Sequence, residues 1–152
     1  MYFLYKKKIR ICFINFPKKS IVFFRKIVFF SLKEKKINTC ELNFILLKNR
    51  EMKNINEKYR KKNTITDVIS FLLVPKMLIG DIYIAKEQSK IQAIKYNNTW
   101  EAELIYLIIH GLLHLYGYTD YDKINKTKMF NEQNKLFKQA MIYNTKLKNF
   151  KY

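Results

Sequence analysis

Apolar and polar positions alternate along several short segments of this chain, which is the pattern of half-buried strands. Residues 9–16 are rich in Ile and Phe and stop at Pro17, which cannot donate to a strand ladder. Residues 40–47 alternate regularly, residues 67–74 are almost wholly apolar, and residues 79–85 alternate again. The pattern therefore predicts four strands, and a short connection joins the last two.

Between and after these segments, apolar positions recur at the three- and four-residue spacing of helices. Thr99 with Glu101 and Glu103 predicts a capped, acidic first turn, and Gly117 predicts the end of the same helix. Ser20 is a candidate cap for the first helix, although the β-branched and aromatic content of that segment also suits a strand. The predicted helices cover residues 20–36, 51–60, 86–96, 99–115 and 122–144.

The order of these elements predicts a mixed α+β fold, in which a small mixed sheet of about four strands is flanked by helices. The 152 residues suit one domain, and neither repeats nor low-complexity linkers divide them, so we expect residues 1–152 to form a single domain. Hydrophobic residues make up 49% and aromatic residues 16% of the chain, which excludes the composition of a disordered protein.

Charge is concentrated at the two ends of the chain. The net charge is +18, of which residues 1–36 carry +10, residues 37–122 carry +1 and residues 123–152 carry +7. Such an excess favours an acidic partner such as nucleic acid or anionic lipid. A second explanation stays open, because Lys, Ile, Asn, Phe and Tyr, which have A/T-rich codons, account for 83 of the 152 residues.

Two cysteines, Cys12 and Cys40, are too few for a disulfide framework and lack the spacing of a metal or redox motif, so we expect both in the core. The longest apolar stretch, residues 21–32, is interrupted by Arg25 and Lys26 and is too short for a membrane span. The N-terminus runs from apolar to basic, the reverse of a secretory signal. We expect a cytoplasmic protein that does not bind membranes.

The candidate chemistry lies in residues 96–122, which contain no Lys or Arg but retain four acidic residues. His110 and His114 are the only histidines, and their spacing places both imidazoles on one helical face, where they can converge on a metal ion such as Zn²⁺. Gly117 breaks the helix, so that Asp120 can return as a third ligand. The alternative is that both histidines are core or surface residues and that Asp120 caps the last helix.

Gly111 occupies the position at which HExxH metalloproteases carry the glutamate that acts as general base. A protease of that mechanism is therefore not expected. A glycine at this position also allows a substrate or another part of the chain to approach the helix closely.

Residues 110–118, HGLLHLYGY, resemble the HGxLHLxGY signature of the YbeY endoribonucleases. Residues 66–71 are similar to the TDVLSF block of that family and residues 79–82 to its LGDI block, and Arg60 precedes Thr66 at the spacing of the family's arginine. These blocks cover about residues 40–140. The sequence departs from the family where Asp120 replaces the usual histidine ligand, Thr119 replaces an aspartate, and Leu72 replaces a proline.

The resemblance implies a single-strand-specific, metal-dependent endoribonuclease that acts in 16S rRNA maturation and ribosome quality control. Its implied partners are single-stranded RNA, 16S rRNA and the small ribosomal subunit, without DNA. One Zn²⁺ ion would be held by His110, His114 and Asp120 on a zincin-like helix. Arg60 would bind a phosphate oxygen, although from the residues alone it is a solvated member of the basic run at residues 60–62.

Two further aspartates, Asp67 and Asp81, either orient a ligand histidine or cap strand ends. Two other functions also remain at this point. An inactive RNA- or ribosome-binding factor would use the metal structurally, and a closed site of four ligands would favour it. A metallohydrolase that acts on something other than RNA would keep the metal and leave the basic charge unexplained.

Overall fold

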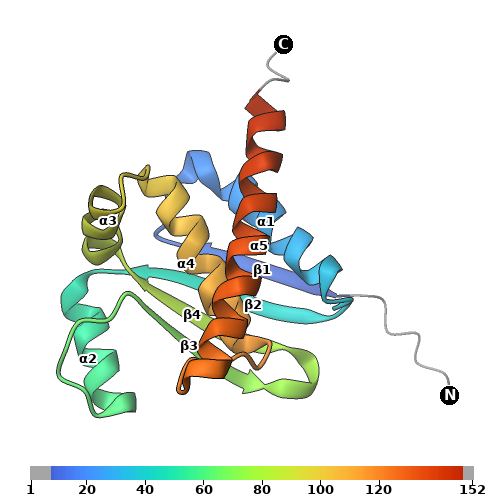
Figure 1. The fold of residues 1–152 in the computed structure, drawn as a ribbon. Coiled ribbons are helices and arrows are strands. Elements are labelled where there is room, and N and C mark those ends of the chain that lie inside the picture. Colours follow the sequence, from blue (N-terminus) through green and yellow to red (C-terminus); the bar gives the residue numbers. More distant parts are fainter. Residues whose placement is uncertain (1–7, 149–152) are drawn as a thin grey trace, which may run out of the picture.

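A four-stranded mixed sheet forms the centre of the computed structural model, which describes the backbone of residues 8–148 and the side chains of residues 8–143. The strands are β1 (Ile9–Ile14), β2 (Cys40–Leu47), β3 (Val68–Val74) and β4 (Ile79–Ala85). Their order in the sheet is β1-β2-β4-β3, as Figure 1 shows. β1, β2 and β4 are parallel, and β3 is the antiparallel edge strand. The predicted mixed sheet is confirmed.

Helices cover the two faces of the sheet unequally (Figure 1). The helices are α1 (Ile21–Glu34), α2 (Asn49–Arg60), α3 (Lys86–Lys95), α4 (Trp100–Leu115) and α5 (Lys123–Lys148), with short 3₁₀ turns η1 (Lys18–Ser20) and η2 (Pro75–Met77). α1, α4 and α5 lie on one face, whereas α2 lies against the other face beside β3 and β4. None of the helices within residues 8–148 combines the length and apolarity that a membrane crossing requires.

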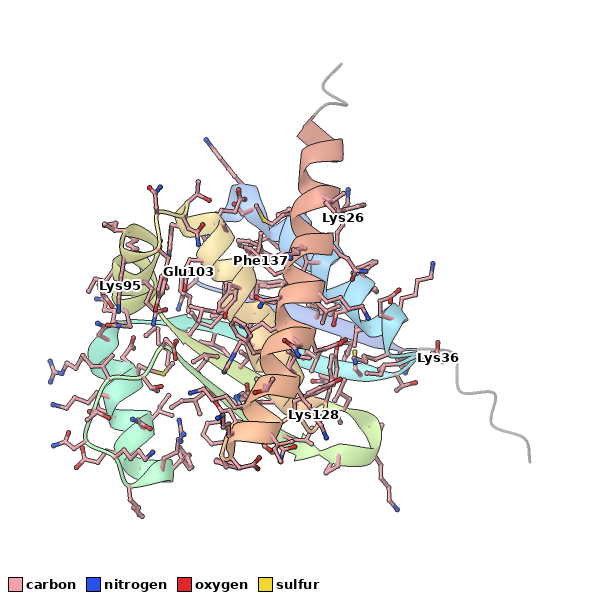
Figure 2. The ribbon with its side chains drawn as sticks, viewed as in Figure 1. Lys26, Lys36, Lys95, Glu103, Lys128 and Phe137 are labelled. Carbon is pink, nitrogen blue, oxygen red and sulfur yellow. The ribbon has the colours of Figure 1, made fainter. Side chains whose placement is uncertain are left out.

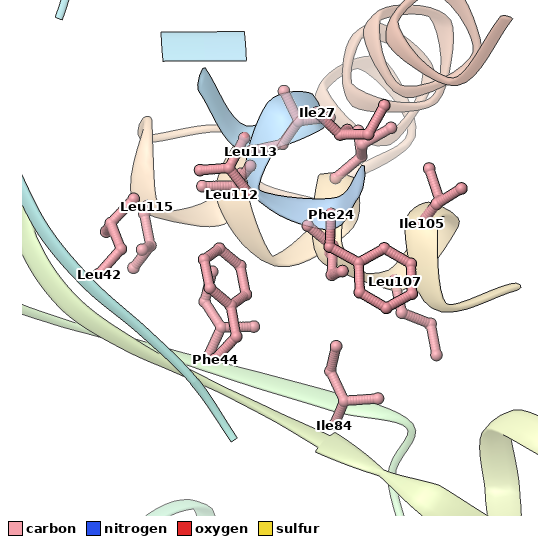
Figure 3. Packing of buried hydrophobic residues seen from close by; sticks show 14 of the residues in the cluster. Phe24, Ile27, Leu42, Phe44, Ile84, Ile105, Leu107, Leu112, Leu113 and Leu115 are labelled. Atoms are coloured by element: carbon pink, nitrogen blue, oxygen red, sulfur yellow. The ribbon is translucent and has the colours of Figure 1, made fainter. Parts of the chain in front are cut away.

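The main core fills the space between the sheet and the helices α1, α4 and α5 (Figure 3). Alternate residues of β2 and β4 point into it, including Phe44 and Ile84, and they meet Phe24 of α1 and Leu112 of α4. All four side chains are fully buried, and each burial of this kind stabilises the fold by about 1.5–3 kcal/mol. Packing of this extent fixes α4 against the sheet.

Gly111 sets how closely α4 approaches β3 and β4. A Cβ atom at this position would lie 2.6 Å from Ile82 Cγ2, so no larger residue fits without a shift. The close approach also lets the Ser70 hydroxyl donate a hydrogen bond to the carbonyl oxygen of Gly111, at 2.9 Å. The sequence predicts that something approaches the helix closely at Gly111, and the structure shows that strands β3 and β4 do so.

Two local expectations are wrong. Ser20 precedes α1 but its side chain makes no capping hydrogen bond, because its backbone is already helical in the 3₁₀ turn Lys18–Ser20. Cys12 is exposed, because alternation along β1 points it away from the core, whereas Cys40 is buried as expected. The first helix is confirmed over the strand alternative, and the last helix continues to Lys148.

Candidate metal centre

Three of the residues that the sequence singles out meet at the end of α4. The Nε2 atoms of His110 and His114 lie 3.1 Å apart, and Oδ2 of Asp120 lies 3.9 Å from His114 Nε2. One ligand atom from each of the three residues lies within 4.8 Å of the other two. This group could therefore hold a metal ion.

The turn after α4 brings Asp120 back towards the histidines. Gly117 has a φ of +94°, which an L-residue rarely adopts, and its N–H donates to the carbonyl of His114 at 3.0 Å. The N–H of Tyr118 donates to the carbonyl of Leu113, also at 3.0 Å. These two bonds form a Schellman motif, so the predicted helix end at Gly117 is confirmed.

Asp120 does not cap the next helix, which was the alternative to a ligand role. That cap is Asp122, whose carboxylate accepts from the backbone N–H of Asn125 at 2.9 Å and from its side-chain amide at 2.6 Å. These hydrogen bonds hold the pKa of Asp122 below its ordinary value. The Asp120 carboxylate therefore remains free to face the histidines.

Hydrogen bonds hold both imidazole rings so that Nε2 of each ring is available to bind a metal ion. The carbonyl oxygens of the Gln133 side chain and of the Tyr118 backbone lie 3.0 Å and 3.1 Å from Nδ1 of His110 and His114 respectively. The Gln133 amide is oriented by its own bond to the carbonyl of Tyr106, at 3.4 Å. Because a carbonyl oxygen only accepts, each Nδ1 carries the proton and each Nε2 presents a lone pair.

A metal ion suits this arrangement. Two lone pairs at 3.1 Å repel each other unless a cation or proton lies near both. Ligand nitrogens at zinc–nitrogen distances of about 2.0–2.1 Å in tetrahedral geometry are about 3.3–3.4 Å apart, close to the separation observed. The donor set of two imidazoles and a carboxylate is one that Zn²⁺ accepts.

The electrostatics of His114 also suit a metal ligand. Burial of the ring, followed by the neighbouring His110, lowers the pKa of His114 below its ordinary value, and Arg60 acts in the same direction. Asp120 and the hydrogen bond to the Tyr118 carbonyl act in the opposite direction. His114 is thus neutral at pH 7, which a metal ligand must be.

The three ligand residues line a cavity of about 430 Å³, which we call the metal cavity. Arg60, at the last position of α2, lines it as well, and within residues 8–143 no carboxylate pairs with its guanidinium. The buried side chain of Asn56 donates to the carbonyl of Thr64 at 2.8 Å and so ties the end of α2 to the loop that leads into β3. The structure thus brings Arg60 to the same cavity as the histidines.

Asp67 and Asp81 have other partners. Asp67 lines the metal cavity, but its carboxylate accepts from the N–H of Val68 at 2.8 Å and from the amide of Gln92 at 3.1 Å. Asp81 lies on the opposite face of the sheet and accepts from Asn43 at 2.9 Å. Within the described residues neither carboxylate is hydrogen-bonded to a histidine. Asp67 binds the first N–H of β3, as a strand-end cap would, whereas Asp81 lies inside β4 and caps no strand end.

Sequence reasoning missed Gln133, which orients His110 in place of an aspartate. Gln133 is 2% exposed and lies on the same side of α5 as Met129, Leu136 and Ala140. A polar residue at helical spacing within an otherwise apolar stripe signals a specific buried partner. That signal is present in the sequence.

The first helix helps to build the turn that carries Asp120. The ammonium group of Lys35 donates to the hydroxyl of Tyr118 at 3.1 Å and pairs with Glu132 of α5 at 3.1 Å. The hydroxyl of Tyr116 is hydrogen-bonded to Ser31 at 3.0 Å, and burial raises the pKa of this tyrosine to about 12. α1 therefore clamps the turn, although residues 1–36 carry no recognisable motif.

Comparison with known proteins identifies close relatives. The model of the family described as Endoribonuclease YbeY matches residues 13–141. A protein of that name from Endomicrobium trichonymphae is 54% identical over 126 residues, which cover 83% of this chain and 89% of that protein. Another from Thermotoga maritima is 35% identical over 108 residues, 70% of this chain and 72% of that protein.

A similar fold is found among solved structures. The solution structure of a Thermotoga maritima protein superposes with a TM-score of 0.64 at 29% sequence identity, covering 92% of this chain and 93% of that one. The region matched by the family model, residues 13–141, includes every residue named above as lining the metal cavity.

Proposed function

The chain belongs to the endoribonuclease YbeY family and is a nuclease, and we propose that it cleaves single-stranded RNA with a zinc ion held by His110, His114 and Asp120. We further propose that its substrate is 16S rRNA, that its partner is the small ribosomal subunit, and that it acts in rRNA maturation and ribosome quality control in the cytoplasm. Family membership supports this biological role, and the metal cavity supports the chemistry.

The observation that carries the proposed chemistry is the meeting of two Nε2 lone pairs beside a carboxylate, in a cavity that Arg60 also lines. Three protein ligands leave the fourth position of a tetrahedral ion open for water or substrate. A structural site would close that position with a fourth side chain. The three-ligand group therefore favours catalysis over a purely structural metal.

Arg60 supplies the contact to the scissile phosphate in this proposal. A zinc ion in the site would polarise a phosphate oxygen and lower the pKa of a bound water. Arg60 donates two parallel N–H bonds to a phosphate oxygen pair and stabilises the charge that develops at phosphorus. Gln133 and the Tyr118 carbonyl keep the ligand histidines in the tautomer that this chemistry requires.

The basic ends of the chain supply the affinity for RNA. The segments 1–36 and 123–152 carry +17 of the net charge of +18, and residues 1–7 and 149–152 of them lie outside the described part. α1 and α5 lie side by side, joined by the pair of Lys35 with Glu132. Their lysines, among them Lys26 and Lys128, project from neighbouring helices (Figure 2). Such a surface suits a phosphate backbone.

Metal analysis combined with an RNA cleavage assay tests the proposed function. We expect one zinc ion per chain and metal-dependent cleavage of a labelled single-stranded RNA, with a duplex of the same sequence cut far more slowly. His114→Ala should lose both the ion and the cleavage. Zinc bound without any cleavage would favour the inactive binding factor, and absence of the ion would overturn the site.

Asp120 offers a sharper version of the same test. Asp120→His introduces the ligand that most of the family carries at this position, so zinc binding should be kept or strengthened. Asp120→Ala removes the ligand and should weaken binding, because only two protein ligands remain. Equal zinc affinity in the Ala variant and the wild type would show that this carboxylate does not bind the metal.

A further inference from the structure

An aromatic groove of about 360 Å³ lies on the outer face of the sheet, between α2 and the strands β3 and β4. We call it the outer groove and define it by the rings of Tyr59, Phe71 and Tyr83 with Lys58 and Asp81. Its volume falls within the range of about 300–1,000 Å³ that is usual for small-ligand sites. Nothing in the chemistry described above uses it.

The outer groove adjoins the metal cavity. Phe71, on the edge strand β3, lines both hollows. Tyr59 lines the outer groove, and the next residue along the chain, Arg60, lines the metal cavity. A chain molecule whose phosphate is held by Arg60 can therefore extend across β3 into the outer groove.

The three rings form a continuous series. The Tyr59 and Phe71 ring centroids lie 5.1 Å apart and those of Phe71 and Tyr83 lie 5.8 Å apart, both edge to face. Phe71 and Tyr83 also pack against the small core beneath α2, so their presence has a structural cause. Tyr59 lies outside that core and is 58% exposed. The edge-to-face contact with Phe71 therefore covers only part of the Tyr59 ring, and more than half of the residue stays accessible.

The charges around the rings suit a base and disfavour a phosphate within the groove. The Asp81 carboxylate repels phosphate, but it can accept a hydrogen bond from the exocyclic amino group of a base. Its oxygens are held by Asn43 at 2.9 Å and by the Tyr83 hydroxyl at 3.4 Å. Lys58 Nζ lies over the Tyr59 ring, 5.1 Å from its centroid, and supplies a cation to which a flanking phosphate can bind.

We propose that the outer groove binds one unstacked nucleobase of the RNA strand that is cut in the metal cavity, with the base stacked on Tyr59. This subsite rests on the proposed function, because it assumes that the strand passes Arg60. It gives a physical reason for a preference for single strands, since a base must leave its stack to enter the groove. The Asp81 carboxylate favours bases that carry an amino group over uracil.

The experiment pairs a protein variant with a change in the RNA. Full-length protein is loaded with zinc, and short single-stranded RNAs each lack one base at successive positions around the cut. Binding is measured in the cold by fluorescence anisotropy, and KM and kcat are measured by cleavage. Base–aromatic stacking is worth about 1–3 kcal/mol, so Tyr59→Leu should weaken binding and raise KM by about 5- to 150-fold, while kcat changes little.

The coupling between ring and base is the decisive readout. At one position near the cut, removal of the base should weaken wild-type binding by about as much as Tyr59→Leu does. At that position alone, the variant should lose nothing further, because the same contact has already been removed. Tyr59→Phe keeps the ring and should retain wild-type binding.

Tyr96 provides a matched control. It is also 58% exposed, and Lys95 Nζ lies 5.5 Å from its ring centroid, but it follows α3 and lies outside both hollows. Tyr96→Leu should bind every RNA as the wild type does. Thermal unfolding of both Leu variants checks that neither change disturbs the fold.

Each outcome separates the subsite from the proposed function. Normal cleavage, with penalties for Tyr59→Leu and base removal that simply add, would overturn the subsite and leave the proposed function standing. Coupling at one base in a protein that cuts no RNA would support the subsite and overturn the proposed catalysis. Equal effects of Tyr59→Leu and Tyr96→Leu, or no effect of either, would also overturn the subsite.

Discussion

Single residues behind the ligands decide which nitrogen of each histidine can bind a metal. For His110 that residue is Gln133, whose side-chain oxygen accepts a hydrogen bond from Nδ1–H at 3.0 Å. Gln133 is itself almost fully buried. For His114 it is the backbone carbonyl of Tyr118, which no side-chain substitution removes. Gln133 is therefore the orienting contact that mutagenesis can reach directly.

We expect Gln133→Leu to lower zinc affinity by about 10- to 100-fold, which is the usual effect of removing a group that orients a metal ligand. Competition with a chelator of known affinity measures this change. Gln139→Leu is the matched control, because Gln139 lies on the same helix with a buried Oε1 that has no partner within the described residues. A Gln133 variant that binds zinc as tightly as the control would contradict the orienting role.

Arg60 is the second residue whose role a conservative change can isolate. Lysine keeps the charge but cannot offer two parallel donors. We expect Arg60→Lys to slow the cleavage of single-stranded RNA by about ten- to a thousandfold, the range for loss of a transition-state donor, with zinc content unchanged. Arg50→Lys, at the other end of α2, should cleave at the wild-type rate. Wild-type rates in the Arg60 variant would show a solvated surface charge.

At the scale of elements, the approach of α4 to the sheet depends on one glycine. Alanine at position 111 would gain about 1 kcal/mol of helix propensity, but its Cβ would overlap Ile82, and overpacking costs about 1–3 kcal/mol. We expect Gly111→Ala to reduce the free energy of unfolding by up to about 2 kcal/mol, as measured by urea denaturation, and to strain the bond from Ser70.

Gly117→Ala provides a contrast to that variant. No atom lies within 4 Å of the position that its Cβ would take, so only the positive φ opposes the change. The strain then falls on the turn that carries Asp120, and zinc affinity should fall along with stability. A Gly111→Ala variant that is more stable than the wild type by about 1 kcal/mol would show that α4 can move away from the sheet without cost.

The sequence predicts an element well where the periodic pattern runs along its whole length. β2 and β4 have the predicted bounds, because buried and partly exposed positions alternate along each strand. α4 ends at Leu115, as predicted from the glycine that follows. The order of strands in the sheet could not be predicted, since alternation shows which side chains face the core and not which strands are neighbours. The exposure of Cys12 was missed for the related reason that β1 is an edge strand with one open face.

The candidate site likewise contains residues that the sequence predicts and residues that only tertiary packing brings together. His110, His114 and Asp120 lie close together in the chain, so helical spacing and one glycine were enough to predict that they meet. Arg60 reaches them only through the packing of α2 beside β3, and the sequence indicated it by resemblance alone. The apolar stripe around Gln133 signals that this residue has a buried partner, but that the partner is His110 depends on the docking of α5 against α4, which a local pattern cannot show.

At the scale of the whole molecule, charge is separated from chemistry. The basic ends include the adjoining helices α1 and α5, whereas the segment that carries the ligands contains no Lys or Arg over residues 96–122. This separation keeps lysines from competing with a metal ion for the carboxylate of Asp120. Apart from Lys35, which holds the turn that carries Asp120, it also allows RNA affinity to be varied without altering the metal cavity.

We expect RNA binding to depend strongly on salt, because contacts with phosphates release counterions. If four or more phosphates of a single strand are contacted, the slope of log K against log salt should be about −3 or steeper. Deletion of residues 1–8 should make the slope shallower without changing sequence preference. A flat dependence would show that the lysine excess reflects codon composition alone.

The ligand set lies within one short stretch of chain, whereas Arg60 is fifty residues away on the far side of β3. Metal retention therefore needs α4, the turn after it and Gln133 of α5, whereas cleavage also needs α2 docked on the sheet. On gradual addition of urea, α2 can detach from its small core while the main core still holds α4. We expect the protein to lose its activity at a lower urea concentration than the one at which it releases zinc.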